Sequence, residues 1–321
     1  MRKIYLFFVI IFLLFSCKQE NIIINHTSSE YEYLIASGNR IIKYKTDGSF
    51  ENLINELPDE VNVIKYFRGN YYVLFKELQL IYVINEKKFD VVAKIDFFDD
   101  MLPIDICFPN ATDAYIYSKE SKYISIVDLT TFSLSNYKIP VSSIPISITG
   151  IGNQVYVCCK ENNTINVIDT RVNEVVDTIN TISNPVYISV DRDGEFVYVI
   201  CQGNDVGLSA IQKISVTTRE ISSPLYISNS NDILIYSIAL SKKNIYIASD
   251  KYILRVPLLN MKSESIVLNR GVNRIKYDSI LDEFYFIAKT DNINTLYRYN
   301  ASTNKTIAKY NIVMDINDII K

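Results

Sequence analysis

Apolar residues along this chain are spaced as in β-strands. They alternate with polar residues or form short blocks rich in β-branched and aromatic side chains, and no stretch has the spacing of a convincing amphipathic helix. One block, which contains a tyrosine among apolar residues, recurs seven times. Its copies begin at Tyr31, Tyr71, Ala114, Val155, Val197, Ile245 and Phe284. The pattern predicts an all-β protein built from a repeated unit.

A second apolar block follows each tyrosine block. Its copies cover residues 41–44, 80–84, 124–127, 165–168, 211–214, 253–256 and 296–299. The 292 residues from 30 to 321 give about 42 residues per copy, which is the length of a four-stranded propeller blade. We therefore predict a seven-bladed β-propeller that spans residues 30–321.

Acidic residues in this pattern are interpreted as turn formers. Asp128, Asp169 and Asn300 begin the turn after the second block in three copies, where a side-chain oxygen can accept a backbone N–H two residues on. Residues 191–195, Asp-Arg-Asp-Gly-Glu, place three carboxylates at alternate positions and suggest calcium, but the further ligands of a calcium loop are missing. We interpret this segment as an Asp-Gly hairpin turn.

The stretch from residue 153 to residue 201 shows the repeat most clearly. It reads Val-Tyr-Val from Val155, Asn-Thr-Ile-Asn-Val-Ile-Asp-Thr from Asn163, Val-Val-Asp-Thr-Ile from Val175, Asn-Pro-Val-Tyr-Ile-Ser-Val from Asn184, and Val-Tyr-Val again from Val197. This string resembles the YVTN-repeat β-propellers of bacterial surface and periplasmic proteins. The resemblance implies the architecture and a bacterial envelope location, and leaves the ligand open.

The two ends of the repeat region predict how the ring closes. The first unit begins with its second strand, at Tyr31, and the chain ends in an apolar segment, residues 312–320. We expect this segment to supply the innermost strand of the first blade, because a closed ring exposes no sheet edges. An alternative is that residues 22–24 cap the ring instead.

The first residues are typical of an export signal. Arg2 and Lys3 precede an apolar run of 12 residues, 4–15, which is shorter than the roughly 20 residues of a membrane-spanning helix. The alternative is a buried strand or a hydrophobic N-terminal helix.

The end of this signal, Leu-Phe-Ser-Cys at residues 14–17, is similar to the lipobox of bacterial lipoproteins. The resemblance implies that residues 1–16 are removed, that Cys17 carries acyl chains such as palmitate, and that residues 17–29, with His26, form a tether. The membrane is then a partner through this lipid, with the outer membrane favoured and the protein facing the periplasm or the cell exterior.

Charge and cysteine content narrow the chemistry. Removal of residues 1–16 leaves 31 basic side chains against 36 acidic ones, and this mild acidity disfavours nucleic acid as a partner. Cys159 and Cys201 occupy the same place in consecutive repeats, too far apart for a disulfide, while Cys158 and Cys159 point to opposite faces of a strand. With Cys107, these cysteines are predicted to be free, buried thiols.

Catalytic and cofactor motifs are not apparent in the sequence. The only histidine lies in the tether, and there is no Gly-x-Ser-x-Gly motif, phosphate loop or zinc-type Cys/His spacing. We therefore predict no catalytic residues, no metal ligands and no cofactor.

Candidate binding residues lie in the loops that follow second strands or connect successive blades. They are Phe97, Phe98, Asp99, Asp100, Lys119, Glu120, Lys160, Glu161, Asn162, Asn163, Gln202, Asn204 and Asp205. Phe97 and Phe98 between acidic residues fit an aromatic anchor with a polar rim, or alternatively pack between blades.

The sequence thus favours a lipid-anchored binding scaffold of the bacterial cell envelope, whose ligand is a protein, a glycan or an envelope component. The alternative function is a lactonase-like or metal-dependent hydrolase with its site at the channel mouth. Three or more carboxylates lining one pocket would favour that alternative.

Overall fold

The computed structural model describes residues 32–45, 49–98, 101–203, 208–227, 234–259, 264–266, 272–290, 293–303, 305–312 and 314–320. The predicted signal peptide, Cys17 and the tether lie outside these residues. Within them the chain forms 28 β-strands and no helix. The described part of the chain accordingly contains no helix that is long and apolar enough to cross a membrane.

The strands are short and follow one another at regular intervals. In chain order they are β1 (Glu32–Ser37), β2 (Arg40–Lys45), β3 (Phe50–Ile54), β4 (Val61–Phe67), β5 (Asn70–Phe75), β6 (Leu80–Asn85), β7 (Val91–Asp96), β8 (Pro103–Cys107), β9 (Asp113–Ser118), β10 (Tyr123–Asp128), β11 (Ser133–Pro140), β12 (Pro145–Ile151), β13 (Gln154–Cys159), β14 (Thr164–Asp169), β15 (Glu174–Asn180), β16 (Pro185–Val190), β17 (Phe196–Cys201), β18 (Ala210–Ser215), β19 (Leu225–Tyr226), β20 (Ile235–Leu240), β21 (Asn244–Ser249), β22 (Ile253–Pro257), β23 (Glu264–Ile266), β24 (Val272–Asp278), β25 (Glu283–Thr290), β26 (Ile293–Asn300), β27 (Lys305–Ile312) and β28 (Asp318–Ile320).

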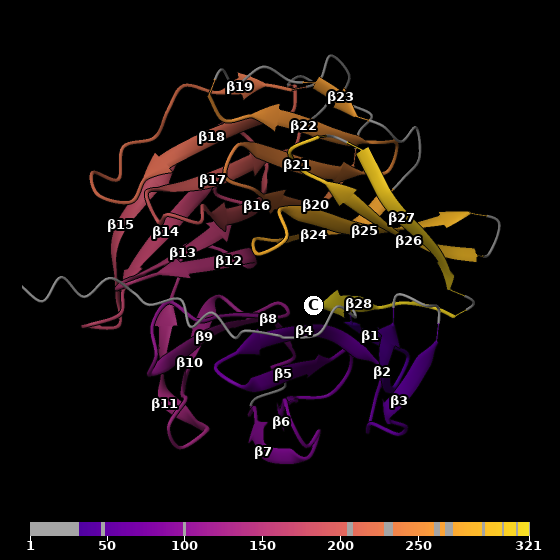
Figure 1. Cartoon of the computed structure of the whole chain (residues 1–321). Coiled ribbons are helices and arrows are strands. Elements are labelled where there is room, and N and C mark those ends of the chain that lie inside the picture. The colour runs from indigo at the N-terminus through magenta and orange to yellow at the C-terminus, as the bar shows by residue number, and fades with distance from the viewer. Residues whose placement is uncertain are drawn as a thin grey trace, which may run out of the picture. The chain divides into compact units, whose positions relative to one another are not determined.

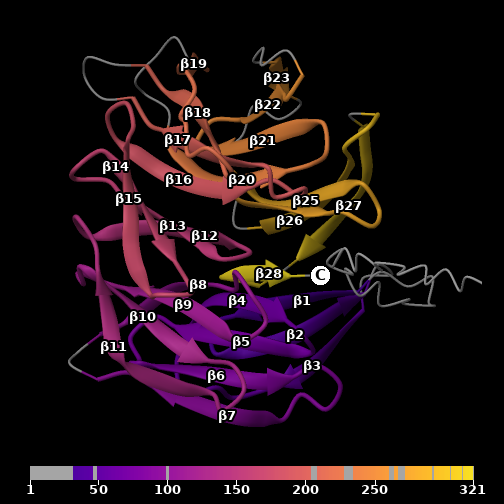
Figure 2. The ribbon, with the colours of Figure 1, turned by 90° about the vertical axis from the view of Figure 1, so that its left-hand side faces the viewer.

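These strands form seven antiparallel sheets of four strands each within the described residues. Blade 1 has the order β28-β1-β2-β3, and blades 2 to 7 each take the next four strands in sequence, from β4–β7 to β24–β27. Figures 1 and 2 show the blades around a common centre, with β4, β8, β12, β16, β20, β24 and β28 innermost. The predicted seven-bladed β-propeller is confirmed.

A buried tyrosine in six of the seven blades explains the repeated sequence block. These six side chains occupy the same register position in the second strand and are at most 5 % exposed: Tyr72, Tyr115, Tyr156, Tyr198, Tyr246 and Tyr285. In blade 1 this position holds Leu34, and the buried Tyr33 lies one residue earlier. A tyrosine ring contributes a large apolar surface, and its buried hydroxyl needs a partner.

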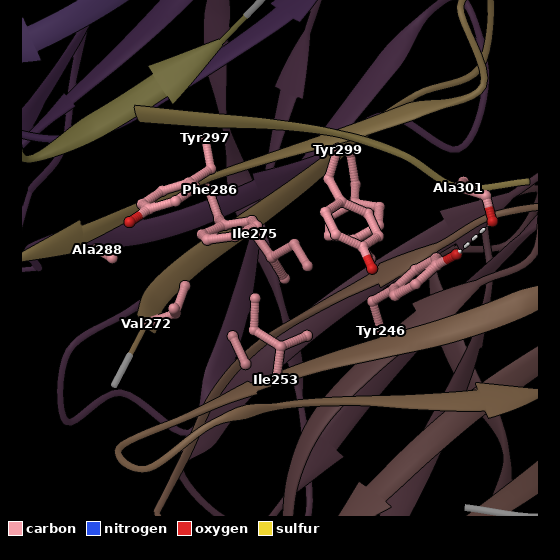
Figure 3. Close-up of a cluster of buried hydrophobic side chains, with 12 residues drawn as sticks. Tyr246, Ile253, Val272, Ile275, Phe286, Ala288, Tyr297, Tyr299 and Ala301 are labelled. Carbon is pink, nitrogen blue, oxygen red and sulfur yellow. Dashed lines mark hydrogen bonds between the residues drawn. The ribbon is translucent and has the colours of Figure 1, made fainter. Parts of the chain in front are cut away.

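The partner of this hydroxyl lies in the next blade in two cases. Tyr115 Oη of blade 3 donates to Asn173 Oδ1 of blade 4 over 2.6 Å, and Tyr246 Oη of blade 6 donates to the Ala301 carbonyl of blade 7 over 3.1 Å (Figure 3). At the ring closure, the rings of Tyr33 and Tyr285 meet edge-to-face at 5.3 Å. The repeated tyrosine therefore joins neighbouring blades.

The inner strands share an isoleucine. It occupies the same register position in every blade and is at most 6 % exposed: Ile64, Ile106, Ile148, Ile188, Ile238, Ile275 and Ile319. Side chains alternate along a strand, so the residues just before and just after this isoleucine share the opposite face. The charged residues of the ring centre occupy these two positions.

The C-terminal strand closes the ring, as the sequence predicts. β28 pairs with β1 through Leu34 and Ile320, Ile35 and Ile319, and Ala36 and Asp318. Asn317 extends this short ladder, because its backbone N–H donates to the Ala36 carbonyl over 2.8 Å. Blade 1 is thus completed by the two ends of the repeat region.

Asn317 also fixes the turn beside the closing strand. Its Oδ1 accepts the Gly38 backbone N–H over 2.8 Å. Its Nδ2 donates to Glu60 of the connection into blade 2, and Glu60 pairs with Lys76 at 2.7 Å. That pair is nearly half exposed, so it contributes little to stability by itself.

The acidic turn residues have the structural roles predicted for them. Asp128 Oδ1 accepts the backbone N–H groups of Thr130 and Thr131 at 2.7 and 3.0 Å. Asp191 Oδ1 accepts the Glu195 N–H at 2.8 Å, while Gly194 takes a φ of +70° that favours glycine. Residues 191–195 are a hairpin turn.

The four cysteines after Cys17 are free and buried, in agreement with the sequence prediction: Cys107, Cys158, Cys159 and Cys201. Burial raises the pKa of the Cys201 thiol to about 12. Because the thiolate is the reactive form, these side chains act as small apolar residues of the core.

Removal of residues 315–321 tests the role of the closing strand. The truncated chain lacks β28, so β1 becomes an unpaired edge, and we expect aggregation and loss of the cooperative unfolding transition. Calorimetry and size-exclusion chromatography against full-length protein measure both effects, with a chain lacking only Lys321 as the control. A truncated protein that melts as sharply and at the same temperature as the control would show that β28 is dispensable.

Candidate functional site

The loops chosen from the sequence lie at one end of the ring. Phe97 and Phe98 follow β7 in the connection to β8, the turns at 119–122 and 160–163 connect second to third strands, and Gln202 follows the second strand β17. Because strands alternate in direction within a blade, these two kinds of connection emerge at the same end. We call this end the loop face.

The two phenylalanines of this face have different environments. Phe97 is 4 % exposed and packs in the core between blades 2 and 3 with Met101 and Ile95, so it is not available to a partner. Phe98 is 62 % exposed. Asp99 and Asp100 lie outside the described residues.

The remaining candidates are spread over three turns. Lys119, Glu120, Lys160 and Glu161 are exposed, and Gln202 is partly buried. Asn204 and Asp205 lie outside the described residues.

Two of the asparagines brace their own turn. Asn162 Nδ2 donates to the Ser142 carbonyl over 2.8 Å, and Asn163 Oδ1 accepts the Asn184 N–H over 2.6 Å. Both bonds hold the β13–β14 turn against neighbouring connections, so these two residues have a structural role. Among the sequence-predicted residues that the structure describes, none lines the central cavity described next.

A cavity of about 610 Å³ occupies the centre of the ring. Side chains of the inner strands line it, with charges on one arc and hydroxyls on the other. The charged residues are Lys65, Lys76, Asp105, Arg274, Lys276, Asp315 and Asp318, of which Lys76 and Asp315 are exposed, and the hydroxyl-bearing ones include Tyr187, Tyr236 and Ser237. We call this the channel site.

Asp318 is the most enclosed charge of the channel site, with no exposed surface. Its Oδ2 accepts the Ile64 backbone N–H of blade 2 over 3.0 Å, and its Oδ1 lies 3.2 Å from Arg274 Nη1 of blade 7. Burial would raise the pKa of Asp318, but Lys276, Arg274 and two backbone amides hold it below the ordinary value. One carboxylate thus connects blades 7, 1 and 2.

Lys65 and Asp105 form the second ion pair of this site, between blades 2 and 3. Lys65 Nζ lies 3.0 Å from Asp105 Oδ1. Burial would lower the pKa of Lys65, but the Asp105 carboxylate, with smaller contributions from Tyr187 and Asp318, raises it above the ordinary value. Lys65 therefore stays protonated.

Among Lys65, Arg274 and Lys276, the positive charge of Lys276 lies farthest from a carboxylate. Its Nζ is 3.7 Å from Asp318 Oδ1, beyond hydrogen-bond distance. Burial lowers the pKa of Lys276, and the neighbouring Lys65 and Arg274 charges lower it further, against the opposing effect of Asp318 and Asp105. At the positions next to the inner isoleucines, the site thus holds three cations and two carboxylates.

In two other blades a serine hydroxyl replaces the Asp318 carboxylate as the acceptor of a backbone N–H from the next blade. Ser147 Oγ of blade 4 accepts the Ile188 N–H of blade 5 over 3.2 Å, and Ser237 Oγ of blade 6 accepts the Ile275 N–H of blade 7 over 3.4 Å. Each of these residues directly precedes the inner isoleucine of its own blade. An uncharged residue at this position therefore also accepts the backbone N–H of the next blade.

Three carboxylates line the cavity, Asp105, Asp315 and Asp318, which is the number that would favour a hydrolase. Asp105 and Asp318 are paired with Lys65 and Arg274. Across the described part of the chain, no group of three or more His, Cys, Asp or Glu side chains is placed to hold a metal ion.

Sequence reasoning overlooked the channel site, although a signal was present. Its charged residues directly adjoin the inner isoleucines, as in Ile64-Lys65, Asp105-Ile106, Arg274-Ile275-Lys276 and Asp318-Ile319. The short inner strands lack the repeated tyrosine block, which makes them harder to align than the second and third strands.

Comparison with known proteins identifies the fold. No protein-family model matches the sequence, and no curated protein matches it. The β-propeller domain of Myceliophteria thermophila Cps50 (Swd1) is similar with a TM-score of 0.65 and 10 % identity, covering 79 % of this chain and 89 % of that one.

Two further structures show the same likeness. Kluyveromyces lactis Hsv2 with its complete loop 6CD has a TM-score of 0.61 and 12 % identity, over 90 % of this chain and 94 % of that one. Kuenenia stuttgartiensis hydrazine synthase has a TM-score of 0.56 and 15 % identity, over 75 % and 83 %. At these identities the comparisons support the β-propeller fold alone.

The Asp318→Asn variant tests the charge at the ring closure. Its amide cannot balance Arg274 and Lys276, so we expect the free energy of unfolding at neutral pH to fall by about 1.5–3 kcal/mol, the range for hydrogen bonds to charged groups. Chemical denaturation measures this loss. Glu161→Gln, a change of an exposed carboxylate on the loop face, is the control.

The pH dependence provides a second readout of the same variant. A carboxyl group whose pKa is lowered by folding stabilises the fold above its unfolded pKa of about 4, and that stability is lost as the pH falls through the folded value. Wild type should therefore lose stability below pH 4 more steeply than Asp318→Asn. Equal acid limbs for the two proteins would contradict the proposed role of Asp318.

Proposed function

We propose that this protein is a non-catalytic binding scaffold of the bacterial cell envelope, anchored through a lipid on Cys17, which binds a protein or glycan on its loop face. The observation that carries the proposal is the pair formed by Phe97 and Phe98. The Phe97 ring is buried in the core, and the ring of Phe98, the next residue, is 62 % exposed. The buried Phe97 therefore holds the backbone that presents Phe98 to solvent.

The backbone around Phe98 is held on both sides. The Phe97 N–H donates to the Gln79 carbonyl over 2.8 Å, and the Met101 N–H donates to the Phe98 carbonyl over 3.4 Å. An aromatic side chain on a fixed backbone loses little conformational entropy when it binds, which favours affinity.

Charged side chains of the adjacent blade are positioned near this segment. The Lys119 N–H donates to the Leu102 carbonyl over 2.8 Å, so the β9–β10 turn with Lys119 and Glu120 is tied to the connection that carries Phe98. An exposed aromatic residue beside charged ones is the usual arrangement of a binding anchor and its rim. Loops on a rigid scaffold are also where recognition residues concentrate.

Lipidation at Cys17 rests on the sequence of the first 17 residues. We expect the mature protein to begin at Cys17 and to carry several acyl chains, because a single chain gives only marginal membrane affinity. Mass spectrometry of the N-terminal peptide from isolated membranes tests this, with Cys17→Ser as the control. An unmodified Cys17, or an exported form that retains Met1, would contradict the anchoring.

Substitution at Phe98 tests the binding surface. The full-length protein, solubilised from membranes with detergent, first captures its partner. Phe98→Ala should then weaken binding by about 2 kcal/mol, a typical value for an interface anchor, while the melting temperature stays the same.

Phe97→Ala is the matched control, because Phe97 is the adjacent residue and its ring is buried. It should lower the free energy of unfolding by about 3–5 kcal/mol, as for other core phenylalanines. Unchanged affinity in Phe98→Ala would remove Phe98 from the interface. Turnover of a lactone or phosphoester that is lost in Glu120→Gln would favour the hydrolase alternative instead.

A further inference from the structure

The charges next to the inner isoleucines do not balance. Lys65, Arg274 and Lys276 face two carboxylates there, Asp105 and Asp318. The other two charged residues of the cavity lining, Lys76 and Asp315, are exposed, and Lys76 pairs with Glu60. Lys65 forms an ion pair with Asp105 at 3.0 Å, and Arg274 forms one with Asp318 at 3.2 Å. One positive charge therefore remains at the centre of the ring.

This surplus charge resides at Lys276. The distance of 3.7 Å to Asp318 exceeds hydrogen-bond length, and about 30 % of the Lys276 side chain is open to the cavity. An ammonium group has three hydrogens to donate. Those of Lys276 therefore point to whatever occupies the cavity.

The cavity has room for a ligand and donors to orient it. Its volume of about 610 Å³ lies within the range of small-molecule sites, roughly 300–1,000 Å³. Tyr187 and Tyr236 line the wall from blades 5 and 6, on the arc that carries hydroxyls instead of charges. Cations on one side and hydroxyl donors on the other suit an acceptor-rich group.

We propose that the channel site binds one small oxyanion, a carboxylate or a phosphate, with its oxygen atoms at the ammonium group of Lys276. A single negative charge neutralises the five-residue cluster. Arg274 and Lys65 lie close enough to Lys276 to add attraction, while both remain paired with their own carboxylates. The volume leaves space for a polar body attached to the anionic group.

A cation or a neutral ligand fits this site less well. A cation would add a fourth positive charge beside Lys276, and a neutral ligand would leave the surplus charge uncompensated in an enclosed space. The inference does not rest on the function proposed for the loop face, since Phe98, Lys119 and Glu120 do not line the cavity.

Isothermal titration calorimetry on the full-length protein tests the proposal. Inorganic phosphate and acetate are titrated separately at constant ionic strength. Binding of phosphate alone assigns the site to a phosphate group, binding of acetate alone assigns it to a carboxylate, and binding of both supports the common oxyanion chemistry. The absence of heat from either anion at millimolar concentrations would overturn the proposal.

Variants then locate the bound anion. Lys276→Met should weaken binding at least tenfold, and Lys276→Arg, which keeps the charge, should restore it to within a few-fold of wild type. Lys243→Met removes an exposed lysine outside the cavity and should leave affinity unchanged. Equal affinities of Lys276→Met and wild type would overturn the assignment, and a thermal melt confirms that each variant is folded.

Discussion

The fold depends on a closing strand of only three residues. β28 contributes Asp318, Ile319 and Ile320 to blade 1, and such a short ladder provides few backbone hydrogen bonds. Side chains supply the rest of the attachment. Asn317 fixes the turn at Gly38, and Asp318 reaches both the blade before it and the blade after it. A propeller without this contact is an open array with two exposed edges, so the closure determines whether the other contacts form one molecule.

The blades are joined by buried polar contacts as well as by apolar packing. The repeated tyrosine carries a large ring from six of the blades into the interface with the next blade, and its hydroxyl donates to a residue of the next blade in two cases. The residue before the inner isoleucine accepts an amide of the next blade, through a serine in two blades and through Asp318 at the closure. Apolar packing alone would tolerate sliding of one sheet on another, whereas a buried hydrogen bond fixes the relative height of neighbouring blades.

The fold could be predicted from the sequence because every blade meets the same packing demands. The second and third strands are buried on both faces, so each copy selects a tyrosine and β-branched neighbours, and the copies can be aligned without a structure. The closing strand could be predicted by counting strands in each copy. The first copy lacked an inner strand, and the C-terminal segment of the chain was apolar enough to supply it. Acidic turn residues and buried thiols were predictable for the same reason, because local geometry determines their roles.

The channel site could not be predicted in this way, because its residues are departures from the repeat. Arg274 and Asn62, which are in contact, are 212 positions apart, and only ring closure brings blades 7, 1 and 2 together. Phe97 and Phe98 show a second limit. Consecutive residues at a strand end point in opposite directions, and composition does not reveal which one faces the core. The sequence therefore identified the segment, and the structure separated its buried residue from its exposed one.

The charges of the channel are more than the fold requires. The position of Lys276, just after the inner isoleucine, holds Cys107 in blade 3, Ala239 in blade 6 and Ile320 in blade 1. Apolar residues thus fill the equivalent place in three of the other six blades, and uncharged hydroxyl residues, Thr149 and Ser189, fill it in two more. Enclosing an ammonium group without a close carboxylate costs free energy, and replacing such a charge by an apolar residue is often neutral or stabilising. Sites that lower stability without a packing benefit are typical of functional positions, which separates Lys276 from Asp318, whose charge is used in closing the ring.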